Sequence, residues 1–232
     1  MKKLLLLSNS TLPGEPFFLW PETYIRQFLG DEVRNILFFP FAGVTISFDD
    51  YYSKVRSRLK DMGYETESAH RAGDKREAID RCDAIAVGGG NTFQLIKYLQ
   101  AGWLPLIREK VNGGVPYFGW SAGANVACPS IKTTNDMPII QPESFEALNL
   151  VSFQINPHYT EAAIPNHGGE TRPDRIKEFL MVNRGIQVMG LPEGSLLEVE
   201  GDNITFRGRN KLKQFITHNE SITIDSDSRV FL

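Results

Sequence analysis

Short apolar runs along this chain predict a series of buried strands. The clearest runs are residues 4–7, 35–39, 84–87, 116–120 and 187–191. Runs that are apolar almost throughout are typical of strands covered on both faces. Weaker patterns predict two more strands, at residues 65–70 and 153–156. The pattern therefore favours a sheet that lies inside the protein, with helices on its two faces.

Segments with a helical period separate these runs. Ser47 is placed to cap a helix in which Tyr51, Val55, Leu59 and Met62 recur at helical spacing. The other predicted helices cover residues 21–29, 74–81, 93–99 and 104–111, and a segment that begins near Pro173. Strands that alternate with helices predict an α/β fold with a mainly parallel sheet in three layers.

The rest of the chain predicts less regular structure. Residues 129–150 form a loop-rich passage, and the segment beyond Glu200 is typical of β-hairpins with Asn203 and Gly208 in turns. We expect one domain across residues 1–232, because a chain of this length supports one sizeable core.

The composition excludes several classes of protein. The net charge of −3 argues against a nucleic-acid-binding protein, which usually carries a basic excess. No apolar run approaches the length of a membrane span, and the segment that imitates a signal peptide, residues 1–10, is apolar only at 4–7. Cys82 and Cys128 give neither a disulfide framework nor a metal-ligand spacing. These observations predict a cytoplasmic protein.

Candidate chemistry begins at Ser121, which joins the predicted strand 116–120 to a helix of small residues from Ala122. It stands in the pattern Gly119-x-Ser121-x-Gly123, the signature of a nucleophile elbow. The turn is so tight that a side chain at either glycine would collide with backbone. The hydroxyl then lies over a helix N-terminus, where free N–H groups favour negative charge. The alternative is an ordinary strand-turn-helix segment with a chance serine.

Four polar elements are predicted to meet at one edge of the sheet. In parallel sheets, ligands bind at the carboxyl ends of the strands. Residues 88–91 and Ser121 directly follow two predicted strands, and His158 and Glu193 lie just past two more. We therefore expect the functional site at this edge.

A serine hydroxyl needs a base to become a useful nucleophile at neutral pH. His158 is the best candidate, because it follows a strand and Pro157 stiffens its approach. Glu193 and Asp136 are both candidates for the acid that orients the base. We favour Glu193, which directly follows a buried strand. The remaining histidines are less well placed, namely His70, His167 and His218.

The glycine run that precedes Asn91 suits an oxyanion hole. Backbone without side chains can approach a reacting carbonyl, so the N–H groups of Gly89 and Gly90 are candidate donors, together with that of Ala122. A phosphate cradle is a weaker interpretation, because neither GxGxxG nor a P-loop with its lysine is present. Asn91 is a candidate helix cap and a candidate substrate-binding residue.

Seven motifs in one order resemble peptidase E, the aspartyl dipeptidases of a serine peptidase family that also includes cyanophycinase. The resemblance extends to about Glu200 and rests on residues 4–11, 39–44, 87–94, 119–125, 133–138, 155–158 and 190–194. Any one of these motifs is weak, whereas seven in the right order are specific.

The resemblance implies a fold similar to that of the class I glutamine amidotransferases, a relative of the flavodoxin-like sheet. In that fold the nucleophile, histidine and glutamate follow the order of Ser121, His158 and Glu193. The family is also described with Asp136 as the acid, so that alternative stays open. The implied activity is hydrolysis of dipeptides with an N-terminal aspartate, without a metal or another cofactor.

Such a substrate needs a cation near its side chain. Arg172 and Arg175 are candidates, because a guanidinium can bind a carboxylate through two hydrogen bonds. Two other functions stay open, a serine esterase or acyltransferase on the same elbow and a catalytically silent binding protein. We expect a small peptide as partner, rather than nucleic acid or a membrane, and either a monomer or a homodimer.

Overall fold

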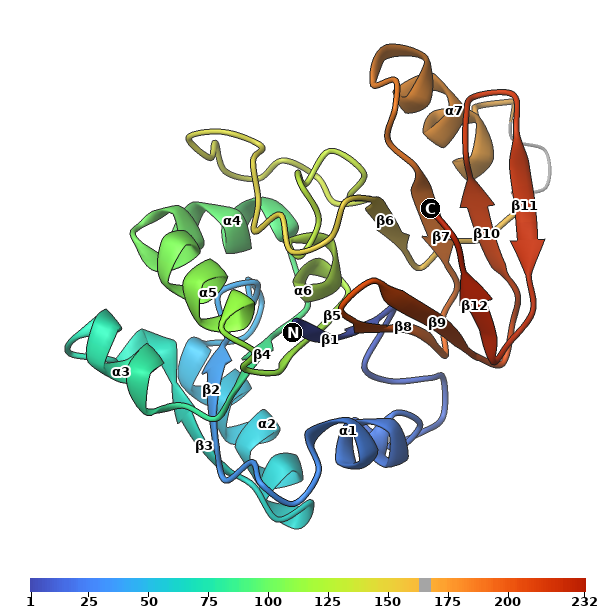
Figure 1. Ribbon diagram of the computed structural model, residues 1–232. Helices are drawn as coiled ribbons and strands as arrows, with labels where there is room; N and C mark the ends of the chain where they lie inside the picture. The colour runs from blue at the N-terminus through green and yellow to red at the C-terminus, as the bar shows by residue number, and fades with distance from the viewer. Residues whose placement is uncertain (163–167) are drawn as a thin grey trace.

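Two β-sheets form the framework of this protein (Figure 1). The computed structural model describes residues 1–162 and 168–232. The larger sheet has eight strands in the order β12-β9-β8-β1-β5-β4-β2-β3. Their bounds are β1 Lys3–Leu7, β2 Asn35–Phe39, β3 Glu65–Ser68, β4 Ala84–Val87, β5 Tyr117–Trp120, β8 Ser195–Glu200, β9 Asn203–Gly208 and β12 Ser228–Val230.

The strands of the larger sheet that alternate with helices are parallel. β1, β5, β4, β2 and β3 run in one direction, and β8, β9 and β12 extend the sheet in antiparallel fashion. The expected mainly parallel α/β sheet is confirmed in these strands.

The smaller sheet was not anticipated. Its order is β11-β10-β7-β6, with β6 at Gln154–Pro157, β7 at Val188–Leu191, β10 at Leu212–Phe215 and β11 at Ser221–Ile224. The expectation that His158 and Glu193 follow strands of the same sheet as Ser121 is therefore wrong. β6 and β7 are parallel neighbours, with Pro157 opposite Leu191, so the two residues that follow them still leave from one edge.

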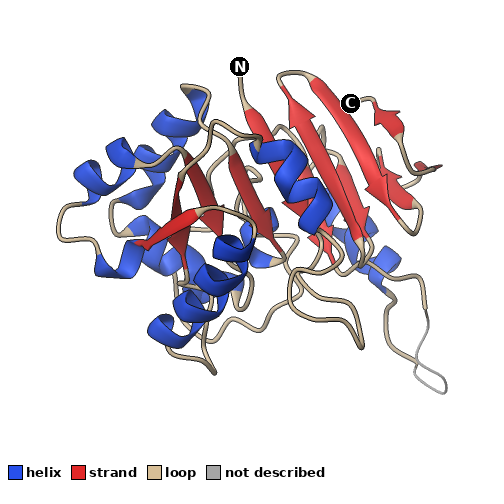
Figure 2. Cartoon of the chain, turned by 90° about the horizontal axis from the view of Figure 1, so that it is seen from below, coloured by secondary structure: helices blue, strands red, loops and turns tan. Residues whose placement is uncertain are grey.

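Helices cover both faces of the larger sheet (Figure 2). Their bounds are α1 Glu22–Leu29, α2 Phe48–Asp61, α3 Lys75–Arg81, α4 Thr92–Gln100, α5 Trp103–Asn112, α6 Ala122–Asn125 and α7 Arg172–Val182, with a 3-10 turn at Ala69–Arg71. The side chains of Ser47, Asp74, Asn91 and Thr171 cap the helices that they precede. These caps satisfy backbone N–H groups that have no partner inside the helix.

Alternating side chains of β1 divide the core into two faces. Leu4 and Leu6 pack with buried residues of α4 and α5, whereas Leu5 and Leu7 pack with those of α1 and α2. A strand points successive side chains to opposite faces, so a run apolar at every position is buried on both. The three-layer arrangement follows directly from this pattern.

The short helix α6 connects the two sheets. It follows β5 and lies beside β6 in Figure 1. Its buried Asn125 donates a hydrogen bond from Nδ2 to the carbonyl of Ile155 in β6, at 2.8 Å. Ala124, Ile155 and Met189 belong to one buried cluster together with Leu6. The segment that carries Ser121 is therefore fixed against the sheet that carries His158.

The segment beyond Glu200 forms the expected hairpins, with one difference. β8 and β9 pair antiparallel, as do β10 and β11. Gly201 and Asp202 form the turn between β8 and β9, whereas Asn203 and Gly208 are the first and last residues of β9. The prediction that Asn203 and Gly208 lie in turns is therefore wrong, since both positions are paired with β8.

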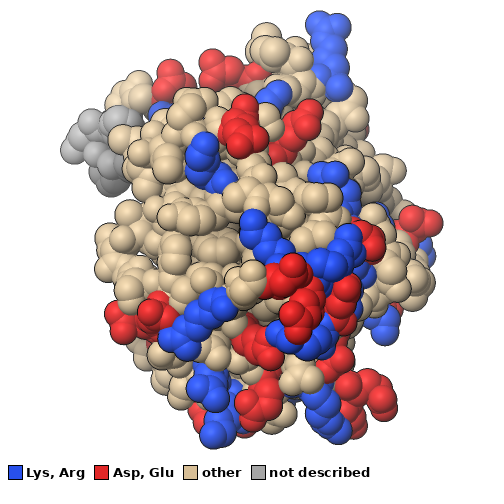
Figure 3. All heavy atoms as spheres, turned by 90° about the vertical axis from the view of Figure 1, so that its left-hand side faces the viewer, with Lys and Arg blue, Asp and Glu red and all other residues tan. Residues whose placement is uncertain are grey.

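The face over α3 and α5 mixes charges of both signs (Figure 3). Arg76 pairs with Glu109, at 2.9 Å, and Arg81 pairs with Glu67 and Glu77. Interspersed charges of this kind do not form a basic surface for a nucleic acid. Among the helices of the described residues, none has the length and apolar character needed to cross a membrane.

Candidate active site

Ser121 occupies a strained turn between β5 and α6. Its backbone lies at φ 53° and ψ −113°, a positive φ that non-glycine residues rarely adopt. The flanking glycines leave no room for a side chain. A Cβ atom at Gly119 would lie 2.5 Å from the carbonyl oxygen of Gly123, and one at Gly123 would lie 2.1 Å from that of Val87. The turn therefore needs glycine on both sides of the serine.

Ser121, His158 and Glu193 form one continuous chain of hydrogen bonds. Ser121 Oγ lies 2.8 Å from His158 Nε2, and His158 Nδ1 lies 2.8 Å from Glu193 Oε1. A carboxylate accepts hydrogen bonds only, so Nδ1 is the nitrogen that carries the proton and Nε2 is free to accept from the serine hydroxyl. The side chains of His158 and Glu193 are 38% and 47% exposed, so a substrate can reach them.

The hydroxyl of Ser8 fixes the position of His158. Ser8 follows β1 and is fully buried. It accepts a hydrogen bond from the backbone N–H of His158 at 2.9 Å and donates one to the carbonyl of Leu191 at 2.8 Å. His158 itself has a positive φ of 54°. One hydroxyl of the larger sheet thus holds the ends of both β6 and β7.

The neighbouring Asn9 fixes the turn that carries Glu193. Its Oδ1 accepts a hydrogen bond from the backbone N–H of Gly194 at 2.9 Å, and its Nδ2 donates to the carbonyl of Thr11 at 2.8 Å. Gly194 has a φ of 71°, in the region that favours glycine. Ser8 and Asn9 together place the base and its acid from the end of β1.

The glycine run after β4 lies against the serine turn. A Cβ atom at Gly89 would lie 2.9 Å from Ser121 Cβ, and one at Gly90 would lie 2.2 Å from the carbonyl oxygen of Ala42. Neither Gly89 N–H nor Gly90 N–H donates to another group of the described residues. The N–H of Ala122 belongs to the first helical residue after the serine. These are the donors expected for an oxyanion hole.

Tyr51 of α2 connects the glycine run to the serine turn. Its buried hydroxyl donates to the carbonyl of Gly89 at 3.0 Å and accepts from Trp120 Nε1 at 3.1 Å. Burial raises the pKa of Tyr51, so the hydroxyl stays protonated and keeps its donor role. The Gly89 carbonyl and the Gly90 N–H share one planar trans peptide and point in opposite directions. Tyr51 therefore also orients the Gly90 N–H.

Asp136 does not contact His158 in this structure. Its Oδ2 accepts hydrogen bonds from Thr92 N at 2.7 Å, Thr92 Oγ1 at 2.6 Å and Thr134 Oγ1 at 3.1 Å. These bonds fix Asp136 at the start of α4, and the acid beside His158 is Glu193. These contacts give no support to the alternative that placed Asp136 in the triad. Its other oxygen, Oδ1, has no hydrogen-bond partner among the described residues.

Two adjoining cavities lie beside Ser121. One, of about 250 Å³, is lined by Ser121, His158 and Glu193 together with Asn9 and Trp120. The other, of about 480 Å³, includes Asn91 and Asp136 in its lining. Ser10, Thr11, Tyr51, Gly89 and Gly90 line both cavities, so the two adjoin at these residues.

The two candidate arginines do not line these cavities. Arg172 and Arg175 belong to α7, whose Ile176 packs against the smaller sheet. Burial lowers the pKa of Arg172, and the neighbouring Arg175 lowers it further. Their expected contact with substrate has no support in the described cavities.

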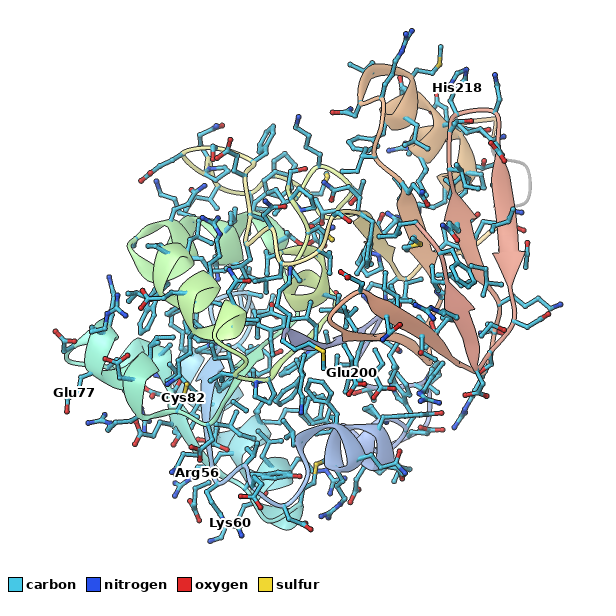
Figure 4. All side chains as sticks on the ribbon, viewed as in Figure 1. Arg56, Lys60, Glu77, Cys82, Glu200 and His218 are labelled. Carbon is cyan, nitrogen blue, oxygen red and sulfur yellow. The ribbon has the colours of Figure 1, made fainter. Side chains whose placement is uncertain are left out.

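Two of the other histidines, His70 and His218, lie away from Ser121. His70 bonds to Ser68 Oγ at 2.7 Å and to Asp49 at 2.9 Å, which imitates a triad, but Ser68 is buried and a substrate cannot reach it. Figure 4 shows His218 near α7 at the far end of the smaller sheet. His167 lies outside the described residues. Within residues 1–162 and 168–232, no group of His, Cys, Asp or Glu is arranged to hold a metal ion.

The family model of "Peptidase family S51" matches residues 4–207 of this chain. This chain belongs to peptidase family S51. The resemblance based on the seven motifs is thereby confirmed, and so is the expectation of a hydrolase, a serine-type peptidase.

Relatives of this S51 chain are similar over nearly their whole length. Peptidase E of Nostoc sp. is 52% identical over 92% of this chain and 89% of its own. Peptidase E of Escherichia coli is 44% identical over 98% of this chain and 99% of its own. Peptidase E of Pasteurella multocida is 43% identical over 98% of each chain.

Two solved structures share the fold of this S51 chain. A peptidase from an acI-B1 actinobacterium has a TM-score of 0.75 at 17% identity and covers all of this chain and 97% of its own. A candidate peptidase E from Listeria monocytogenes has a TM-score of 0.66 at 23% identity, covering 90% of this chain and all of its own.

Proposed function

We propose that this protein is a serine dipeptidase that hydrolyses dipeptides with an N-terminal aspartate. The observation that carries the proposal is the continuous chain from Ser121 through His158 to Glu193, beside the free N–H groups of Gly89 and Gly90. Relatives that are named peptidase E, at 43% identity or more over most of the chain, support the substrate class.

In the first half of the reaction, Ser121 Oγ attacks the carbonyl carbon of the aspartyl residue. His158 Nε2 takes the hydroxyl proton, and Glu193 stabilises the imidazolium through Nδ1. The electron pair of the carbonyl moves to its oxygen. The N–H groups of Gly89, Gly90 and Ala122 are the donors for this oxyanion.

In the second half, His158 gives its proton to the leaving amine as the peptide bond breaks. The product amine departs, and the aspartyl group stays on Ser121 as an ester. A water molecule then loses a proton to His158 and attacks this ester, and the proton returns to Ser121 as aspartate is released. Each proton that His158 accepts is thus returned within the cycle.

Asp136 is suited to bind the free α-amino group of the substrate. It lines the larger cavity beside Asn91, and its Oδ1 is the oxygen without a partner in the described structure. An ammonium group donates to such a carboxylate through a strong, charge-assisted hydrogen bond. Asn91 is less free, because its Oδ1 caps α4 and its Nδ2 donates to the carbonyl of Met137.

The proposal includes the cytoplasm as the place of action. Cys82 and Cys128 are free and buried, which agrees with a reducing compartment. Gel filtration coupled to light scattering would decide between a monomer and a homodimer, and fractionation of cells would test the location.

Hydrolysis of Asp-Leu, Leu-Leu and N-acetyl-Asp-Leu, with and without a chelator, tests the proposed function. We expect cleavage of Asp-Leu alone, unaffected by chelator and lost in Ser121→Ala. A folded protein that cleaves none of the three but hydrolyses simple esters would point to the esterase instead. Cleavage that survives Ser121→Ala would mean that the elbow is structural.

A further inference from the structure

The larger cavity carries one cationic side chain. Of the described residues that line the two cavities, Lys54 of α2 is the single lysine or arginine. Phe17, Val44 and Ile46 line the same cavity, and Phe17 contacts Lys54 directly. No motif in the sequence pointed to this residue, because it is an exposed lysine on a helix rich in charge.

One aromatic contact connects the Lys54 ammonium group to the side chains that pack around Trp120. Lys54 Nζ lies 4.6 Å from the centroid of the Phe17 ring, at a distance that allows a cation–π contact. The Phe17 ring lies edge-on to Trp120, with centroids 6.4 Å apart, and Trp120 directly precedes Ser121. Lys54 therefore contacts Phe17, which packs against the residue that precedes the nucleophile.

We propose that Lys54 binds a carboxylate of the dipeptide in the larger cavity. This inference rests on the proposed function. A free Asp-Xaa dipeptide has two carboxylates, one on the aspartyl side chain and one at the C-terminus. Either of them is an acceptor for an ammonium group, and the experiment below distinguishes them.

The opposite charges of the larger cavity suit such a zwitterionic ligand. Asp136 and Lys54 both line it, so it offers a partner for the ammonium group of a dipeptide and one for a carboxylate. Val44, Ile46 and Ile139 add apolar lining to the polar groups, as in most small-molecule sites. A longer peptide would have to place an uncharged amide where the cavity offers charge.

The test measures binding to the Ser121→Ala protein by calorimetry, so that turnover does not interfere. The probes are Asp-Leu, Asp-leucinamide, which lacks the terminal carboxylate, and Asn-Leu, which lacks that of the side chain. We expect Lys54→Met to lower the affinity for Asp-Leu about tenfold. This is the low end of the range for a hydrogen bond to a charged group, because Lys54 is exposed. Lys54→Arg keeps the charge and should bind Asp-Leu nearly as before.

The probe whose affinity Lys54→Met leaves unchanged identifies the carboxylate that Lys54 binds. If the variant binds Asp-Leu more weakly but Asp-leucinamide as before, Lys54 binds the C-terminal carboxylate. If it binds Asp-Leu more weakly but Asn-Leu as before, Lys54 binds the carboxylate of the aspartyl side chain. Lys60→Met is the matched control, since Lys60 lies lower on α2, at the surface in Figure 4, and lines neither cavity. Arg172→Met tests the arginine expected from the sequence.

The inference is overturned if Lys54→Met binds all three probes as the parent does, or if only Arg172→Met weakens them. Hydrolysis of Asp-Leu by the wild-type protein is measured in parallel. Its absence would contradict the proposed function itself, whereas hydrolysis without an effect of Lys54→Met would contradict the role of Lys54 alone.

Discussion

The hydroxyl of Ser8 accepts a hydrogen bond from the backbone N–H of His158 at 2.9 Å, across 150 residues of sequence. Ser8 follows β1, a central strand of one sheet, and His158 follows β6, the edge strand of the other. The base is therefore placed relative to the nucleophile by a contact between two sheets. Each sheet alone would leave Ser121 or His158 without its partner.

Ser8→Ala should impair catalysis as well as stability. The substitution leaves the partly buried N–H of His158 without its acceptor, which costs about 1 kcal/mol of unfolding free energy. We also expect kcat to fall about tenfold, because a small misplacement of the base is expensive. Kinetics with Asp-Leu and chemical denaturation measure the two effects.

Ser68→Ala provides the matched control for Ser8→Ala. Ser68 is also buried and hydrogen-bonded, but its partner His70 lies outside the site. We expect it to lose stability and keep kcat. An equal loss of kcat in both variants would show that Ser8 acts through general stability and not through the position of His158.

Glu193→Gln should slow the acylation of Ser121. The amide can present its N–H to His158 Nδ1 and so favour the wrong tautomer. Because Glu193 is 47% exposed and water can partly replace it, we expect a loss of about ten- to hundredfold, less than for a buried acid. The rate at which an organophosphorus fluoride labels Ser121 measures this step without any dipeptide.

Asp136→Asn should behave differently when labelling of Ser121 and hydrolysis of Asp-Leu are both measured. The reagent has no α-amino group, so its reaction with Ser121 should proceed at the wild-type rate. Hydrolysis of Asp-Leu should show a KM raised at least about tenfold, the loss of one charge-assisted bond. Slow labelling of Ser121 in Asp136→Asn would return this residue to the triad.

Tyr51→Phe should lower kcat with little change in KM. The Gly89 carbonyl loses its donor, so the Gly90 N–H is no longer held toward the oxyanion, and Trp120 Nε1 loses its acceptor. A full oxyanion donor contributes about a hundredfold or more, and we expect about tenfold for one that is only loosened. Steady-state kinetics with Asp-Leu separate kcat from KM.

Tyr52→Phe removes the same group from the next residue of α2. The Tyr52 hydroxyl is buried and donates to the carbonyl of Thr66 at 2.7 Å, away from the glycine run. Both variants should lose similar stability, and only Tyr51→Phe should lose kcat. A parallel loss in Tyr52→Phe would assign the effect to the packing of α2.

Thiol reagents should leave the activity intact at neutral pH. Burial raises the pKa of Cys82 to about 11 and also raises that of Cys128. The thiolate is the reactive form, and a raised pKa means that little of it exists at pH 7. Iodoacetamide should label both cysteines only after unfolding. Inactivation of the folded protein with one cysteine labelled would contradict the serine mechanism.

The sequence by itself determined the local parts of this protein. The apolar runs predicted β1, β2, β4 and β5 because a strand buried on both faces must be apolar at successive positions. The pattern around Ser121 predicted the elbow because only glycine fits on either side. These properties depend on residues that are close together in the chain, and so they can be predicted from the sequence.

Only the tertiary structure decided how those parts meet. The sequence offered no reason to single out Ser8, Tyr51 or Lys54, because the contacts on which their proposed roles rest are made with residues far away in the chain. The choice of Glu193 over Asp136 likewise follows from which carboxylate reaches His158. Hydrogen bonds and cavities depend on positions in space. The packing of the two sheets sets those positions, and the local pattern of apolar residues does not predict that packing.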